Sequence, residues 1–189
     1  LRRERVALAE VLGRAAEMAA PLIESRGHVL RLTPPPAALF VDGDAGRLNQ
    51  VFANLLTNAA RYTPEGGAIE VEVATGGERC IVTVADNGLG IEAELLPRIF
   101  ELFVQGRQGP DRAGGGLGVG LALVKNLVGL HGGSVSATSP GPGRGSVFTV
   151  TLPLARGASA GAAAAPAAVV PAPAARRARV LVVGDSRDA

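Results

Sequence analysis

The sequence is poor in aromatic residues, cysteine and lysine, and each shortage excludes a class of function. Aromatic residues make up 3% of the 189 residues and tryptophan is absent, so stacking platforms for single-stranded bases are scarce. The single cysteine, Cys80, cannot form an internal disulfide framework or a cysteine-built metal site. Because Cys80 lies in an apolar run, we expect a buried, inert thiol.

The charge and the hydropathy of the chain narrow the possible classes of function further. Lys125 is the only lysine, and the scattered arginines leave a formal net charge of +2, which does not indicate a nucleic-acid partner. No apolar stretch reaches the roughly 18–20 residues that span a bilayer, and no signal peptide opens the chain. Since the chain begins at Leu1 and stops in mid-pattern at Ala189, we expect a fragment of a longer protein.

Apolar periodicity predicts alternating helices and strands with ample material for a core. Hydrophobic residues make up 47% of the chain. Helical stripes are expected at 6–26, 44–62 (with Asp44 as N-cap) and about 117–131. Strands are expected at 28–33, 38–41, 69–74, 80–85, 134–138 and 146–152, with a loop containing short helical pieces at 86–113. The pair at 69–74 and 80–85 resembles a hairpin.

Two further segments follow this domain. Residues 155–178 are almost entirely Ala, Pro and Gly, which is typical of a flexible linker. Residues 179–183 then read as the first strand of another domain that is cut off.

The helix at 44–62 carries a polar stripe opposite its apolar face. The apolar face holds Leu48, Val51, Phe52, Leu55, Leu56 and Ala59, and the polar stripe holds Gln50, Asn54, Asn58 and Arg61. A solvated surface is one interpretation, but asparagine is a poor residue for a helix interior. A carboxamide oxygen can bind Mg²⁺, and Arg61 could meet phosphates. The stripe therefore suggests a site without proving one.

A first glycine-bearing loop, 86–91, follows an apolar strand. Asn-Gly is a common hairpin turn, but the residues after it, 92–96, read as helix rather than as a returning strand. The Asp86 carboxylate at the strand end could accept a hydrogen bond from the amino group of adenine, while Gly88 and Gly90 would let a planar base approach the backbone.

A second glycine-rich loop, 114–121, matches neither the P-loop nor the dinucleotide fingerprint. It precedes a strong helical pattern, so a flexible linker is disfavoured, and the free N–H groups of a helix start suit a polyphosphate. Between the loops, residues 98–103 include Phe100 and Phe103. We expect these phenylalanines to pack in the core and anchor a mobile segment, 104–115, over the nucleotide.

In this order the motifs resemble those of histidine kinases. Residues 48–64 look like the N box, 86–90 like the first glycine box, 100–103 like the F box and 116–121 like the second glycine box. The resemblance covers 1–154 and implies the Bergerat ATP-binding fold, an α/β sandwich with a mixed sheet packed on helices. It also implies ATP and Mg²⁺ as cofactors, with Asn58 as the metal ligand, Asp86 as the adenine partner, Arg61 and Tyr62 near the phosphates, and 104–115 as the lid. The full implied ATP site is Asn54, Asn58, Arg61, Tyr62, Asp86, Gly88, Gly90, Phe103, Gly116, Leu117, Gly118, Val119, Gly120 and Leu121.

The resemblance further implies a bacterial protein histidine kinase that lacks its own acceptor. It also implies a location in the cytoplasm, either as a cytoplasmic protein or as the cytoplasmic part of a membrane-anchored sensor. Related hydrolases place a water-activating Glu where this chain has Asn54, and a neutral amide is a poor general base. The γ-phosphoryl group would go to a histidine of the dimerisation domain of the same full-length kinase, and a homodimer would form only through that missing region. Neither His28 nor His131 has the sequence context of such an acceptor, so structural roles are expected for both.

Residues 180–185 resemble the opening strand of a receiver domain, which implies a hybrid kinase in a two-component phosphorelay whose partner is a receiver or response regulator. Gly184 stands where receivers carry the first of two acidic residues, and only Asp185 remains. Two alternatives stay open: a non-catalytic nucleotide-binding module, and a serine kinase of the anti-sigma-factor type. The F box and the receiver-like tail speak against the serine kinase.

Overall fold

The computed structural model describes residues 2–33, 39–104 and 118–155. These residues belong to one compact unit, Leu1–Ser159. The predicted linker (155–178, apart from Ala155) and the receiver-like strand (179–189) lie outside the described residues, as does most of the predicted lid. No helix within the described ranges is both long and apolar enough to cross a membrane.

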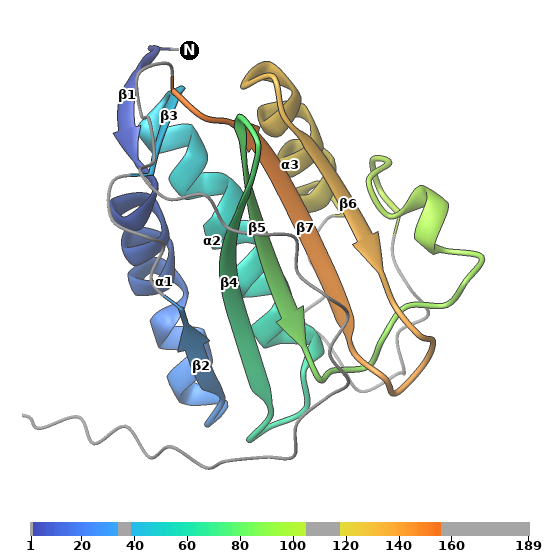
Figure 1. Cartoon of the computed structure of the whole chain (residues 1–189). Helices are drawn as coiled ribbons and strands as arrows, with labels where there is room; N and C mark the ends of the chain where they lie inside the picture. Colours follow the sequence, from blue (N-terminus) through green and yellow to red (C-terminus); the bar gives the residue numbers. More distant parts are fainter. Residues whose placement is uncertain (1, 34–38, 105–117, 156–189) are drawn as a thin grey trace, which may run out of the picture. The chain divides into compact units, whose positions relative to one another are not determined.

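A five-stranded mixed sheet forms one layer and three helices form the other (Figure 1). The strand order is β2-β4-β5-β7-β6; β2 pairs with β4 in parallel, and the other neighbours are antiparallel. The strands are β2 (Val29–Leu32), β4 (Ala68–Gly76), β5 (Arg79–Asp86), β6 (Ser134–Thr138) and β7 (Ser146–Pro153). The helices are α1 (Leu8–Ser25), α2 (Ala45–Tyr62) and α3 (Gly120–Leu130). The predicted α/β sandwich with a mixed sheet is confirmed.

The alternation of buried and exposed residues along the strands determines which face of the sheet the helices cover. In β5 the buried residues are Cys80, Val82 and Val84, and in β7 every second residue from Ser146 to Leu152 is buried. These side chains meet the apolar face of α2, whose Leu48, Phe52 and Leu55 are fully buried. The opposite face of the sheet has no helix in the described part of the chain, so the core lies entirely between the sheet and the helices.

One strand was not predicted. Glu4–Ala7 forms β1, which pairs antiparallel with β3 (Phe40–Gly43) in a small separate sheet. The helix expected from residue 6 therefore begins at Leu8. The guanidinium of Arg5 lies 4.3 Å from the centre of the Phe40 ring, a cation–π contact that joins the two strands.

At both ends of α2, backbone groups that the helix leaves free form hydrogen bonds with side chains. At the start, the Asp44 side chain accepts a hydrogen bond from the Arg47 N–H, which confirms the predicted N-cap. The backbone N–H groups of Arg2 and Arg47 lower the pKa of the Asp44 carboxyl. At the other end, the Ala60 carbonyl accepts from His28 Nε2 at 2.8 Å and the Arg61 carbonyl accepts from the Arg26 guanidinium at 3.3 Å. Carbonyls that a helix end leaves free are thus satisfied by tertiary contacts.

His131 joins α3 to α2. Its Nδ1 donates to the Leu127 carbonyl at 2.7 Å and its Nε2 accepts from the Asp44 N–H at 3.0 Å, an arrangement that only the neutral ring can satisfy. Gly43 leaves room for the imidazole, because a Cβ there would lie 2.9 Å from His131 Nε2. His28 and His131 are both buried and both bonded to backbone, in agreement with the structural roles expected for them.

Burial predicts an unreactive Cys80. The side chain is fully buried in the core, and desolvation raises the pKa of its thiol, so thiolate is scarce at neutral pH. We expect a disulfide reagent such as DTNB to react with the folded chain at least about 100-fold more slowly than with the chain unfolded in urea, as followed by absorbance. Equal rates in the two conditions would contradict this burial.

Candidate nucleotide-binding site

Asp86, the last residue of β5, has its carboxylate fixed by two donors. One oxygen accepts from the Gly88 N–H at 2.8 Å and the other from the Ser146 hydroxyl at 2.6 Å. Asp86 and Ser146 are paired directly across β5 and β7, so their side chains lie on the same face of the sheet, the one covered by the helices. Each carboxylate oxygen keeps a lone pair for a further donor.

The glycines of the first loop are required by close backbone contacts. A Cβ on Gly88 would lie 2.5 Å from the Tyr62 carbonyl oxygen and 2.6 Å from an Asp86 carboxylate oxygen. Gly90 has a φ of 68° and faces the Gly141 carbonyl oxygen without space for a side chain. The backbone segments therefore approach each other so closely at these two positions that only glycine fits.

These contacts bring the asparagine stripe and the first loop together. The Leu89 N–H donates to the Tyr62 carbonyl at 3.0 Å, so the loop sits at the C-terminal end of α2. Asn58 and Arg61 lie in the last turns of that helix, half-buried. Among the described residues no hydrogen bond engages the side chain of Asn54 or Asn58.

The start of α3 faces the same region. The C-terminal end of α3 is bound to the N-terminal end of α2 through His131 and Asp44, and the two helices pack together, so they run antiparallel. With 11 residues, α3 extends about 16 Å back along α2. Its N-terminus, with the described part of the second glycine loop (118–121), is thus about level with Asn54 and Asn58.

The F box is divided between the core and the surface. Phe100 packs edge-on against Phe148 with ring centres 6.3 Å apart, as expected, but the expectation of core packing for Phe103 is wrong, since it is 74% exposed. The Phe103 N–H donates to the Gly118 carbonyl, and Gly118 approaches its backbone so closely that a Cβ would lie 2.9 Å from Phe103 Cα. Phe103 is the one described residue other than glycine with a positive φ, +63°. The same contact brings the F box against the second glycine loop.

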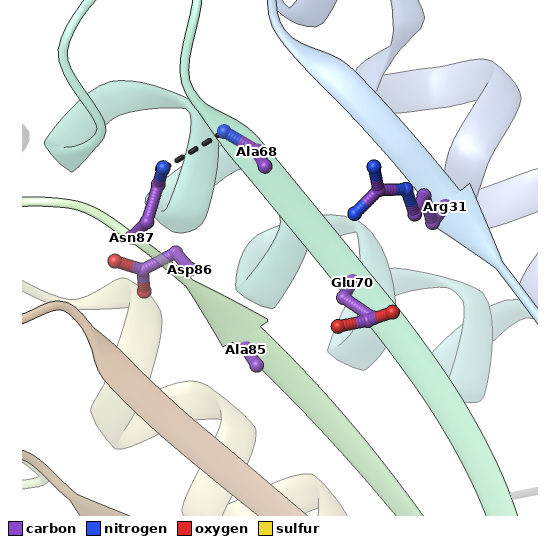
Figure 2. Close-up of a pocket in the computed structure, with 6 residues that line it drawn as sticks. All are labelled: Arg31, Ala68, Glu70, Ala85, Asp86 and Asn87. Carbon is purple, nitrogen blue, oxygen red and sulfur yellow. Dashed lines mark hydrogen bonds between the residues drawn. The ribbon is translucent and has the colours of Figure 1, made fainter. Parts of the chain in front are cut away.

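A shallow hollow of about 190 Å³ lies near Asp86 on the open face of the sheet. Its lining residues are Arg31, Ala68, Glu70, Ala85, Asp86 and Asn87. Figure 2 shows the Asp86 carboxylate pointing away from Arg31 and Glu70, and the Asn87 side chain bonded to the Ala68 N–H at 2.8 Å. The hollow is therefore separate from the region between Asp86 and α2.

Comparison with known proteins identifies the domain. Residues 43–156, more than half of the chain, match the family model described as histidine kinase-, DNA gyrase B- and HSP90-like ATPase. The chain belongs to this ATPase family.

Similar curated proteins and solved structures include several sensor histidine kinases. The chain is 39% identical over 115 residues to the probable sensor histidine kinase TcrY of Mycobacterium tuberculosis, covering 60% of this chain and 24% of TcrY. Among solved structures, the mycobacterial sensor histidine kinase MprB is 29% identical with a TM-score of 0.67, over 80% of this chain and 98% of that one. Full-length ShkA in complex with AMPPNP is 30% identical with a TM-score of 0.70, over 82% of this chain and 32% of ShkA. The chain spans about a quarter of the length of the curated relatives it matches.

The structure joins two of the predicted groups directly: the end of α2 and the loop 86–90 are linked by the hydrogen bond from Leu89 to Tyr62. Residues 118–121 contact Phe103 and begin α3, which packs on α2. Gly116, Leu117 and lid residues 105–115 lie outside the described residues. Ser146 was missed, because its role depends on the pairing of two strands 60 residues apart and no local motif marks it. The described residues contain no cluster of three His, Cys, Asp or Glu side chains that could hold a metal ion.

Proposed function

We propose that the domain binds ATP with Mg²⁺ and donates the γ-phosphoryl group to a histidine on a dimerisation domain outside this chain. The main support is the Asp86 carboxylate, held by Gly88 and Ser146 with lone pairs to spare beside the end of α2. The amino group of adenine is a hydrogen-bond donor that could bind to one of the unused lone pairs of the Asp86 carboxylate. Arg61 and Tyr62, at the end of α2, would then meet the phosphates.

The residues fit a magnesium ion of the kind that accompanies nucleotides. Mg²⁺ in such sites takes one or two protein oxygens and fills the remaining positions with water and phosphate oxygens. Asn58 offers one neutral carboxamide oxygen that no described group engages, so it would serve as the single protein ligand. The ion would neutralise charge on the phosphates during transfer.

The chemistry assigned to the domain is transfer rather than hydrolysis. Asn54 lies one turn before Asn58, and its neutral amide cannot take a proton from water. In the transfer, an imidazole nitrogen forms a bond to the γ-phosphorus while the bond to the β,γ-bridging oxygen breaks, and ADP leaves with the electron pair. A proton lost from the imidazole goes to solvent.

The test is a transfer experiment with labelled ATP. We expect the purified chain with Mg²⁺ to label the acceptor histidine of a matching dimerisation domain, and to release little free phosphate when that domain is omitted. ATP binding without labelling of any histidine would favour the non-catalytic module, and labelled serine on a partner would favour the serine kinase. If the chain does not bind ATP, all three candidate functions are refuted.

We also propose that the domain continues through a flexible linker (155–178) into a receiver domain starting at 179, as in a hybrid kinase. The support is the Ala-, Pro- and Gly-rich composition of the linker and the apolar run Val180–Val183 before Asp185. The response regulator, or a receiver in the same protein, would be the next carrier of the phosphoryl group.

A further inference from the structure

The hydroxyl of Ser139, the residue after β6, uses its full hydrogen-bonding capacity. Its oxygen accepts from the Ile91 N–H at 2.9 Å and from the Gly141 N–H at 3.2 Å, and it donates to the Gly145 carbonyl at 2.7 Å. A hydroxyl has one donor and two acceptor positions. Ser139 therefore ties the end of the first glycine loop to both sides of the β6–β7 turn.

That turn, residues 139–145, lies along the first glycine loop. The Gly143 N–H donates to the Leu89 carbonyl at 2.6 Å and the Gly145 N–H donates to the Gly88 carbonyl at 3.0 Å. Gly145 also touches the Asp86 carbonyl oxygen so closely that a Cβ has no room. The loop after β5 is thus held between the end of α2 on one side and the β6–β7 turn on the other.

The two attachments of Ser139 reach Asp86 from both directions. Through the Gly145 carbonyl it fixes the residue next to Ser146, whose hydroxyl binds one Asp86 oxygen. Through the Ile91 N–H it fixes the end of the loop whose Gly88 N–H binds the other oxygen. Both donors that orient the carboxylate therefore depend on segments that this one hydroxyl joins.

We propose that Ser139 is a positioning residue for adenine recognition, acting through the Asp86 carboxylate without touching the nucleotide. The proposal rests on the nucleotide site described under the proposed function and adds a residue to it. Removing the hydroxyl leaves the Ile91 and Gly141 N–H groups without their acceptor. Asp86 then samples orientations that do not match the base.

The experiment measures nucleotide binding to the full 189-residue chain by titration calorimetry. Ser139→Ala is expected to weaken ATP binding and ADP binding by the same factor, about tenfold, while the affinity for GTP changes by less than about twofold. Ser139→Thr keeps the hydroxyl and is expected to return ATP affinity to within about threefold of the unmodified chain. The matched control is Ser136→Ala, which removes the hydroxyl of an exposed serine on β6, three residues before Ser139, and it should change nothing.

A role limited to stability predicts a different result, because loss of folded protein lowers ATP and GTP binding alike. Equal loss of both nucleotides, or Ser139→Ala binding ATP as well as the unmodified chain does, overturns the proposal while leaving the nucleotide site intact. An unmodified chain that binds no ATP refutes the site itself, and the positioning role with it.

Discussion

Replacing Asp86 with asparagine is expected to weaken ATP binding roughly 10- to 100-fold. The carboxylate accepts from the Gly88 N–H through one oxygen and from the Ser146 hydroxyl through the other. An asparagine can keep only one of these positions as an acceptor, so an N–H group takes the other. If the adenine amino group approaches that position, two donors face each other, and the lost hydrogen bond leaves an unsatisfied group in a half-buried site. Calorimetric titration with ATP in the presence of Mg²⁺ measures the change.

The control for Asp86→Asn is Glu70→Gln. Glu70 is an exposed carboxylate on the neighbouring strand β4, on the open face of the sheet (Figure 2), and its substitution removes the same charge. ATP affinity should stay within about twofold of the unmodified chain, because the Glu70 carboxylate is exposed, points away from the Asp86 carboxylate and is screened by solvent. If both substitutions weakened binding equally, the effect would be one of net charge and the adenine role of Asp86 would be wrong.

Local patterning predicted most of the fold because most elements follow a regular period. The apolar positions of α2 recur at helical spacing and its first turn is capped by Asp44, so both the helix and its start were predictable. The hairpin β4–β5 alternates buried and exposed residues across Gly77, which adopts a φ of +61°. β1 was not predicted because its four residues directly precede the helical stripe. Its extended conformation depends on pairing with β3, more than 30 residues away.

The site was predicted in outline, through residues that belong to motifs. Asp86 and the glycines stand in recognisable local patterns. Ser139 and Ser146, by contrast, are ordinary serines whose bonds to Ile91 and Asp86 span 48 and 60 residues. Their roles exist only once β5, β6 and β7 have paired. Phe103 shows the opposite error: an apolar residue near the half-buried Phe100 suggests a core position, but Phe103 is exposed and its backbone packs closely against Gly118. Hydrophobicity alone does not determine burial where a loop is held by its own backbone.

Replacing Asn58 with alanine is expected to lower the rate of phosphoryl transfer about 100- to 1,000-fold, the largest effect we expect from a single substitution. The carboxamide oxygen is the only metal ligand that we assign to the protein, so its loss removes the link between α2 and the magnesium-bound phosphates. Adenine recognition by Asp86 remains, and ATP binding measured without Mg²⁺ should change by less than about threefold. Single-turnover labelling of the acceptor domain measures the rate, and calorimetry with and without Mg²⁺ measures the affinity.

The matched control is Gln50→Ala, which removes a carboxamide from the same polar stripe of α2. Gln50 accepts from the Arg47 guanidinium at 3.2 Å near the start of the helix, far from the end that meets the first glycine loop. Its loss should leave transfer within about twofold, since exposed hydrogen bonds of this kind contribute little. A slow Asn58→Ala variant whose Mg²⁺ dependence matched the unmodified chain would mean that the side chain orients the phosphates by hydrogen bonding instead. Only a loss confined to magnesium-dependent binding and transfer identifies Asn58 as the metal ligand.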